Sequence, residues 1–226
     1  MALTVLFVVA GAAGLFGAIT LANRLVVIGD LESGDFGADI LDRVDEADDL
    51  VVASAFTFGG MVLATAAVFI VWMWRSSKNN EALGRDMPRL SSGWAIGGWF
   101  IPLANFVIPI LIMQDLWRGS NASIPRGDMR WRIANRSALV GWWWGTLILS
   151  VLRFGPVGDT DPGTDLDDLR AADFAGLFAM LFAVASSVLA ILVVRRLEAR
   201  QVATLRAEQA AWTAVHATAD RVGSGA

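Results

Sequence analysis

The strongest constraint on this chain is the length of its apolar runs. Four windows, residues 3–27, 50–74, 137–152 and 174–194, hold one charged side chain between them. The hydrocarbon core of a bilayer is about 30 Å thick, and about 20 helical residues cross it. Because 55% of its residues are hydrophobic and its mean hydropathy is +0.54, we expect an integral membrane protein with four spans.

The apolar windows also indicate the fold class. Backbone inside a bilayer must satisfy its own hydrogen bonds, so only helices and closed barrels cross it. The runs are continuous and lack the alternation of a barrel strand, which predicts an all-α helical bundle. The first run has no basic segment before it and is longer than the apolar part of a signal peptide, so we expect it to stay as a span. We expect one transmembrane helical domain over residues 1–195 and a cytoplasmic helical tail over residues 196–226.

Missing residue types exclude several classes of site. The sequence has no cysteine, and its single histidine, His216, lies in the tail. Disulfides, iron–sulfur clusters, thiolate zinc sites and a bis-histidine haem within one chain are thereby excluded. No set of nucleophile, base and orienting group can be assembled, and no phosphate-binding glycine loop is present. We predict no catalytic, metal or cofactor site, no nucleic-acid partner, and a protein that is not an enzyme.

A fifth apolar segment, residues 94–117, is interrupted. It contains Pro102, Asn105 and Pro109, and each proline removes a backbone donor and disturbs the preceding helical turn. The segment is predicted either to enter and leave the membrane on one side, as a re-entrant element, or to cross as a fifth span. Because non-helical backbone at membrane depth needs cover from protein, we expect the re-entrant element to be buried against the other helices.

Aromatic spacing and charge point to different answers for this segment. Trp94 and Trp117 are 23 residues apart, about 34 Å of helix, which is the spacing of aromatic belts at the two ends of a span. If the segment does not cross, 14 Lys and Arg lie on the side of the tail and four on the other; if it crosses, the best division is 12 and six. The positive-inside rule therefore favours the re-entrant form, with both termini cytoplasmic and two acidic connectors, residues 29–49 and 155–173, outside.

Nine of the ten tryptophans fall between Trp72 and Trp144, near the cytoplasmic interface of that topology. Amphipathic indole rings are favoured at this depth, so an anchoring belt is the first interpretation. An aromatic cage for a cationic or ring-bearing ligand is the alternative, and it requires several rings to converge.

Polar residues lie within and at the end of the interrupted segment, and ionisable groups at membrane depth are candidates for function. Asp115 and Arg118 are three residues apart, so on a helix they can form a local ion pair at the water boundary. For Asn105 we expect hydrogen bonds to backbone groups that the prolines free, with ligand binding as the alternative.

Small residues recur four positions apart, a spacing that lets helices approach closely. We therefore expect these positions at helix–helix contacts. The pairs are Ala13 with Gly17, Gly60 with Ala64, and Gly141 with Gly145.

The interrupted segment also carries a motif. Residues 91–109 read SSGWAIGGWFIPLANFVIP, and residues 113–120 read MQDLWRGS. Two further features accompany this W-F-x-P-x-x-N-x-x-x-P core: a W-x-x-R-x-x-x-N pattern formed by Trp72, Arg75 and Asn79, and a Trp142-Trp143 pair. Over roughly residues 50–195 the chain resembles an uncharacterised family of bacterial multi-span membrane proteins, described as a domain of unknown function. The resemblance implies a bacterial inner membrane. The candidate functional residues are Arg75, Asn79, Trp99, Pro102, Asn105, Pro109, Asp115, Trp117 and Arg118.

Proline, asparagine and tryptophan thus gather in one segment. The leading prediction is a non-enzymatic membrane protein, embedded in the lipid bilayer, whose segment binds a lipid, a small molecule, a membrane-protein partner or a second copy of the chain. A small-solute transporter or channel-like protein is the alternative, because broken helices commonly build sites at the bilayer midplane, although the two halves show no internal repeat. An enzyme acting on membrane lipids is the third possibility.

Overall fold

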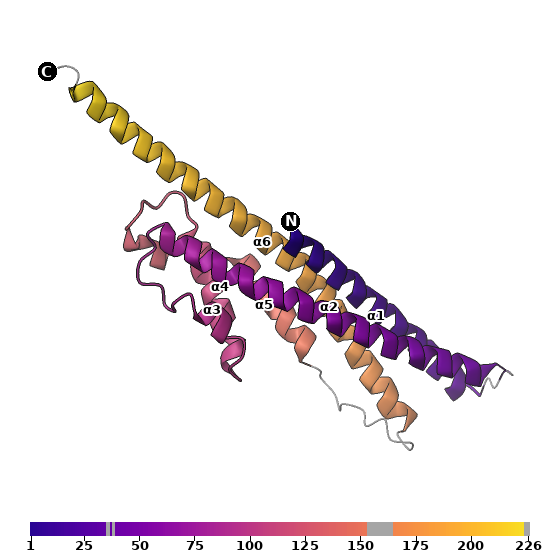
Figure 1. The fold of residues 1–226 in the computed structure, drawn as a ribbon. Coiled ribbons are helices and arrows are strands. Elements are labelled where there is room, and N and C mark those ends of the chain that lie inside the picture. The colour runs from indigo at the N-terminus through magenta and orange to yellow at the C-terminus, as the bar shows by residue number, and fades with distance from the viewer. Residues whose placement is uncertain (35–36, 38, 153–164, 224–226) are drawn as a thin grey trace. The chain divides into compact units, whose positions relative to one another are not determined.

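The computed structural model describes residues 1–34, 37, 39–152 and 165–223, and every regular element in those ranges is a helix (Figure 1). The all-α prediction is confirmed there. In chain order the elements are α1 (Ala2–Glu32), α2 (Ile40–Ala82), α3 (Trp94–Gly97), the 3-10 helix η1 (Ala104–Phe106), α4 (Ile108–Gly119), the 3-10 helix η2 (Met129–Ile133), α5 (Ala138–Val151) and α6 (Leu166–Gly223).

Three of these helices are long and apolar enough to cross a membrane: α1, α2 and the part of α6 from Leu166 to Ala214. They contain the predicted spans at 3–27, 50–74 and 174–194. The remaining predicted span corresponds to α5, which has 14 residues and is about 21 Å long, short of a hydrocarbon core of about 30 Å. Helix α6 runs without interruption from Leu166 to Gly223 and so continues from the predicted span at 174–194 into residues 196–223.

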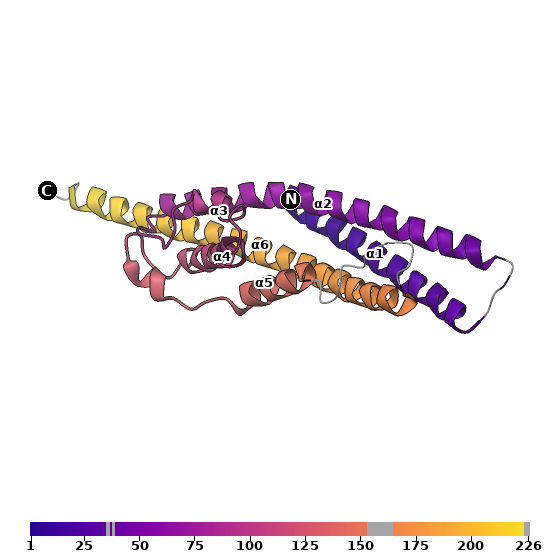
Figure 2. The same ribbon diagram turned by 90° about the horizontal axis from the view of Figure 1, so that it is seen from below.

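The chain divides into two compact units. The first unit comprises residues 1–68 and 142–191, and the second comprises residues 69–141 and 192–226. In the first unit α1 runs beside the early part of α2, as both ribbon views show (Figures 1 and 2). In the second unit the short elements α3, η1 and η2 each contact α4.

Helix α1 packs through its small residues. A Cβ atom added at Gly14 would lie 3.3 Å from the ring of Phe58 on α2 and 3.4 Å from Val184 on α6, and one added at Gly17 would lie 3.3 Å from Met180 on α6. Glycine therefore lets the three helices approach closely. Ala13 is buried on the same helix, so the prediction for Ala13 and Gly17 is confirmed.

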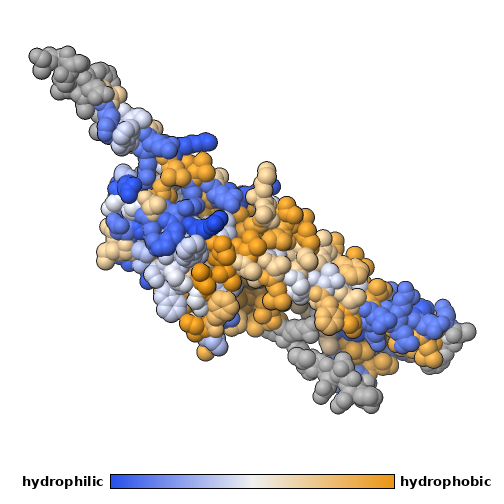
Figure 3. All heavy atoms as spheres, viewed as in Figure 1, coloured by the Kyte–Doolittle hydropathy of each residue, from blue (hydrophilic) through white to orange (hydrophobic). Residues whose placement is uncertain are grey.

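The other predicted small-residue contacts are not made. A Cβ atom at Gly60, Gly141 or Gly145 would meet nothing within 4 Å. The prediction of helix contacts was wrong for these two pairs, because spacing alone does not say which face of a helix a neighbour covers. In α2 the exposed residues include large apolar ones, with Phe56 at 80% and Leu63 at 74% exposure. Figure 3 likewise shows hydrophobic residues on the outer surface of the long helices, as expected of helices that face lipid.

One guanidinium joins three helices in the first unit. Arg24 on α1 donates from Nε to Oδ2 of Asp173 on α6 at 2.8 Å, and from Nη1 to Oδ1 of Asp48 on α2 at 3.0 Å. Its Nη2 also contacts the other oxygen of Asp173. Asp173 is only 1% exposed, so its charge is balanced by a two-point contact with Arg24.

Candidate functional site

The broken segment, defined here as residues 94–119, changes direction between α3 and α4. Leu103 has a φ of 64°, which a residue with a side chain rarely adopts, and it follows Pro102. At the same turn a Cβ atom on Gly98 would lie 2.9 Å from Cβ of Ile108 and 2.8 Å from the carbonyl oxygen of Trp94. Only glycine allows this approach of α3 to the start of α4. The segment is therefore not one continuous helix of about 34 Å.

The turn of the broken segment, residues 100–107, is exposed. Phe100 is 74% and Leu103 is 80% exposed. Our prediction that the segment is buried was wrong for this turn. The other large apolar residues exposed there are Ile101, Phe106 and Val107.

The exposed turn satisfies much of its own backbone. The N–H of Asn105 donates to the carbonyl of Ile101 at 3.0 Å, and the N–H of Phe106 donates to the carbonyl of Leu103 at 3.2 Å. The N–H of Val107 donates to Ala104 at 3.0 Å in the same way. Cover by neighbouring helices is needed only for backbone groups that lack partners, which explains why the expected burial is not required.

The motif residues of the turn have different environments. Pro102 is exposed and Pro109 is fully buried. The indole of Trp99 packs edge-on against Phe69, with ring centroids 6.0 Å apart. Asn105 is half-buried, and its Oδ1 is buried without a hydrogen-bond partner among the described residues, so this oxygen does not accept from the backbone as we expected.

The W-x-x-R-x-x-x-N pattern joins α2 to α6. Trp72 donates from Nε1 to Glu198 at 3.1 Å, and Asn79 donates from Nδ2 to Oε1 of Gln201 at 3.3 Å. Arg75 is exposed. Two residues of the pattern, Trp72 and Asn79, therefore hold α2 and α6 together.

A buried amide pair that the sequence analysis missed lies next to Asn79. Gln201 donates from Nε2 to the carbonyl of Ser76 at 3.1 Å and to Oδ1 of Asn80 at 3.4 Å. Asn80 also donates to the carbonyl of Leu116 at 3.4 Å, which ties α2 and α6 to α4. Buried polar groups need hydrogen-bond partners. A polar residue on the otherwise apolar face of each helix was therefore the sequence signal that could have indicated this contact.

Arg85 is a second residue that the sequence analysis missed. It is 2% exposed, and its guanidinium donates to four carbonyl oxygens at the end of α4 and in the loop after α4, at 2.7–3.2 Å. Burial lowers the pKa of this guanidinium from its ordinary value. The planar fork of arginine fits several acceptors at once, so Arg85 shapes the loop rather than offering a charge to a ligand. The acceptors belong to Gly119, Asn121, Ile124 and Pro125.

The predicted ion pair at the end of α4 is present and larger than expected. Oδ1 of Asp115 lies 3.7 Å from Nη1 of Arg118 and 3.6 Å from Nε of Arg89, and the N–H of Arg89 donates to Oδ2 at 3.4 Å. Arg118 is 6% exposed, and its Nη1 donates to the carbonyl of Arg132 at 3.1 Å. Burial lowers the pKa of Arg118, the charges of Arg89 and Arg136 lower it further, and Asp115 opposes the shift.

The tryptophans differ widely in exposure. Trp131 is 2% exposed and belongs to the core of the second unit, whereas Trp142 is 71% exposed in the first. The guanidinium of Arg200 lies over the ring of Trp117, 4.5 Å from the ring centroid, and Arg200 also donates to the Trp117 carbonyl at 3.1 Å. The face of Trp117 is thus already used by a cation from the same chain.

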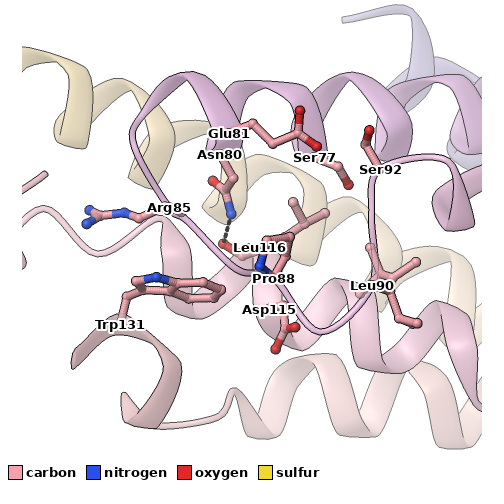
Figure 4. Close-up of a pocket in the computed structure, with 11 residues that line it drawn as sticks. Ser77, Asn80, Glu81, Arg85, Pro88, Leu90, Ser92, Asp115, Leu116 and Trp131 are labelled. Carbon is pink, nitrogen blue, oxygen red and sulfur yellow. Dashed lines mark hydrogen bonds between the residues drawn. The ribbon is translucent and has the colours of Figure 1, made fainter. Parts of the chain in front are cut away.

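A small cavity of about 30 Å³ lies between α2, the loop that follows it and α4 (Figure 4). Asn80, Glu81 and Asp115 contribute polar groups to its wall, and Trp131 lines it at the lower left of this view. Cavities of about 10–15 Å³ accommodate a water molecule, whereas sites for drug-sized molecules measure about 300–1,000 Å³. The cavity is large enough for water but not for a metabolite.

The described part of the chain is thus all-helical, with three apolar helices of membrane-spanning length and a proline-broken segment. Residues 38–199 match the family described as "Domain of unknown function (DUF4328)". Since that match covers most of the chain, the protein belongs to this family, as its motif predicted. No curated protein and no solved structure matches the chain.

Proposed function

We propose that the protein is a four-span protein of the bacterial inner membrane, with both termini in the cytoplasm and the broken segment re-entrant from the cytoplasmic side. Helices α1, α2, α5 and α6 are the spans. The basic residues that flank the broken segment support this arrangement through the positive-inside rule. The predicted span 137–152 consists of the 14-residue helix α5 and one flanking residue at each end.

The length of α4 supports the re-entrant form. Its 12 residues make a helix about 18 Å long, which is close to half of a hydrocarbon core of about 30 Å plus the adjoining headgroup region. With Arg118 at the headgroups, the exposed turn at 100–107 reaches the middle of the bilayer. An exposed set of Phe, Ile, Leu and Val side chains is stable there and costly in water.

The function that this geometry supports best is non-catalytic binding of a membrane constituent by the broken segment. The observation that carries the proposal is the turn that exposes Phe100 and Leu103 while its backbone bonds to itself. The small volume of the neighbouring cavity supports contact at the protein surface over an enclosed solute, and so ranks transport second.

Cysteine labelling tests the topology directly, because the chain has no native cysteine. Ser91 and Ser123 flank the broken segment and both are exposed. We expect Ser91→Cys and Ser123→Cys to react with a membrane-impermeant maleimide only from the cytoplasmic side. Ser33→Cys is the external control and Thr213→Cys the cytoplasmic one, since both positions are also exposed. Labelling of Ser91→Cys and Ser123→Cys from opposite sides would overturn the re-entrant form.

A second measurement tests the depth of the turn. Leu103→Cys carrying an environment-sensitive fluorophore is expected to emit as in hydrocarbon and to be quenched most by lipids labelled near the end of the acyl chain. The same fluorophore on Ser123→Cys serves as the matched probe outside the membrane. A water-like emission from position 103 would contradict insertion of the turn.

A further inference from the structure

Two arginines contact one carboxylate at the end of α4, and two more act on this ion pair through their charges. Asp115 is in contact with Arg89 and Arg118, at 3.6 and 3.7 Å. Arg132 is joined to Arg118 through its carbonyl at 3.1 Å, and the charges of Arg132 and Arg136 act on this group as well. We call Arg89, Arg118, Arg132 and Arg136 the arginine cluster. Asp115 is the one carboxylate whose charge acts on Arg118 among the described residues.

The central guanidinium of the arginine cluster is poorly satisfied. Arg118 is 6% exposed, and of its five N–H donors one makes a hydrogen bond to a described residue, from Nη1 to Arg132. Its Nε is buried without a partner among the described residues. The contact with Asp115, at 3.7 Å, is longer than a hydrogen bond. A buried charge with unused donors is costly unless an anion or another acceptor completes it.

The two outer arginines are available to a ligand. Arg132 in η2 and Arg136 in the connection to α5 are both exposed. The four arginines and Asp115 together carry three net positive charges, with Arg118 buried and the other three arginines exposed. Planar guanidinium groups bind phosphate oxygens in pairs, which makes phosphate the anion that best fits several arginines at once.

We propose that the arginine cluster binds the phosphate group of an anionic membrane lipid. The choice of a lipid as the source of the phosphate rests on the proposed function, which places Arg118 at the level of the headgroups. Arg118 is 11 residues, or about 16 Å of helix, from the end of the exposed turn at residue 107. The lipid phosphate then balances the arginine cluster while the apolar turn contacts the acyl chains.

The test measures the affinity of the full-length protein, in a neutral detergent, for phosphatidylglycerol and for phosphatidylcholine. We expect wild-type protein to prefer phosphatidylglycerol. The double variant Arg132→Gln with Arg136→Gln removes two exposed charges and should bind phosphatidylglycerol roughly 25-fold more weakly, at about fivefold for each arginine. Unchanged binding by this variant would overturn the proposal.

Arg126→Gln with Arg206→Gln is the matched control. It makes the same change of charge at two exposed positions of the second unit outside the arginine cluster. We expect this control to bind phosphatidylglycerol within about threefold of wild type. An equal loss in both double variants would show a general effect of charge and would contradict a defined site.

Asp115→Asn tests whether the carboxylate of Asp115 opposes binding of the lipid phosphate. The carboxylate of Asp115 competes with an incoming phosphate for the same arginines, so its removal is expected to tighten phosphatidylglycerol binding severalfold. An ion pair that serves only to hold α4 in place predicts no gain. Weaker binding by this variant in protein that remains folded, as judged by circular dichroism, would count against the site.

Inorganic phosphate distinguishes the two sources of the ligand. We expect it to displace phosphatidylglycerol only weakly, because it lacks acyl chains. Binding of inorganic phosphate as tight as that of the lipid would overturn the lipid assignment. The labelling experiment at Ser91 and Ser123 is independent of this test. If the arginine variants lose lipid binding but labelling shows that the segment crosses the membrane, the lipid site stands and only the proposed topology is refuted.

Discussion

The two units of the protein use their polar side chains in different ways. In the first unit, charged side chains on the long helices bind one another, as Arg24 binds Asp173, Arg43 binds Asp30 at 2.7 Å and Arg170 binds Glu32 at 2.5 Å. In the second unit, polar side chains bind backbone carbonyls: Arg85 binds four of them, and Gln114 exchanges two hydrogen bonds of 2.9 Å with the backbone of Ser137.

The difference follows from the state of the backbone. Inside a regular helix each carbonyl already accepts from the N–H four residues later, so a side chain can add only a second bond to it, as Thr20 does with the carbonyl of Gly17 at 3.0 Å. In the connection between α4 and α5, at residues 119–137, the side chains of Arg85, Arg118 and Gln114 donate to backbone carbonyls. This connection therefore depends on arginine and glutamine donors, which the second unit supplies.

The charge of the two units differs in the same sense. The first unit has 15 Asp and Glu against four Lys and Arg, and the second has 14 Lys and Arg against seven Asp and Glu. In the first unit the described basic residues, Arg24, Arg43 and Arg170, each contact a carboxylate. In the second unit arginines outnumber carboxylates, and Arg85, Arg118 and Arg200 donate to backbone carbonyls.

The largest expected effect tests the ion pairs of the first unit. Asp173→Ala should destabilise the protein by about 3–5 kcal/mol, because it leaves Arg24 without its buried partner. Asp48→Ala, which removes the 53% exposed partner of the same arginine, should cost less than about 1 kcal/mol. Equilibrium unfolding in neutral detergent measures both free energies. Equal costs for the two variants would show that burial does not set the strength of this three-helix contact.

The next effect compares one substitution in both units. Arg85→Lys keeps the charge but loses the planar fork, and we expect it to cost about 2–3 kcal/mol and to speed proteolysis between residues 119 and 127. Arg43→Lys makes the same change at an ion pair whose side chains are 40% and 35% exposed, and should cost less than about 1 kcal/mol. A similar cost in both variants would mean that Arg85 acts through its charge and not through its geometry.

The sequence predicted those structural elements that depend only on residues close together in the chain. Long apolar runs predicted α1, α2 and α6, and Pro102 with Pro109 predicted the break, because length, hydropathy and a missing donor act on the residues that carry them. The same reasoning could not choose the helix faces in contact. Ala13 with Gly17 and Gly141 with Gly145 have the same spacing, yet the first pair is packed and the second is open.

The candidate site was predicted in part for a similar reason. Asp115 and Arg118 are neighbours on one helix, so their contact follows from spacing. Arg89 and Arg132 join them through loops, and Gln201 reaches Asn80 across 121 residues of sequence. Such partners depend on how the loops return, which no local pattern encodes. Asn105 was predicted to bond the broken backbone, but the turn bonds to itself instead.

The smallest expected effect concerns the turn that makes the second unit different. Gly98→Ala should cost about 1–2 kcal/mol, because the new methyl group would lie 2.8 Å from the carbonyl oxygen of Trp94 and would push against Ile108. Gly97→Ala is the matched control at the adjacent residue, where a Cβ atom meets nothing within 4 Å, and it should be neutral or slightly stabilising because alanine favours helix. Thermal unfolding monitored by tryptophan fluorescence compares the two. If Gly98→Ala is as stable as Gly97→Ala, the close approach of α3 to α4 does not hold the broken segment, and its loop contacts to Arg85 must do so instead.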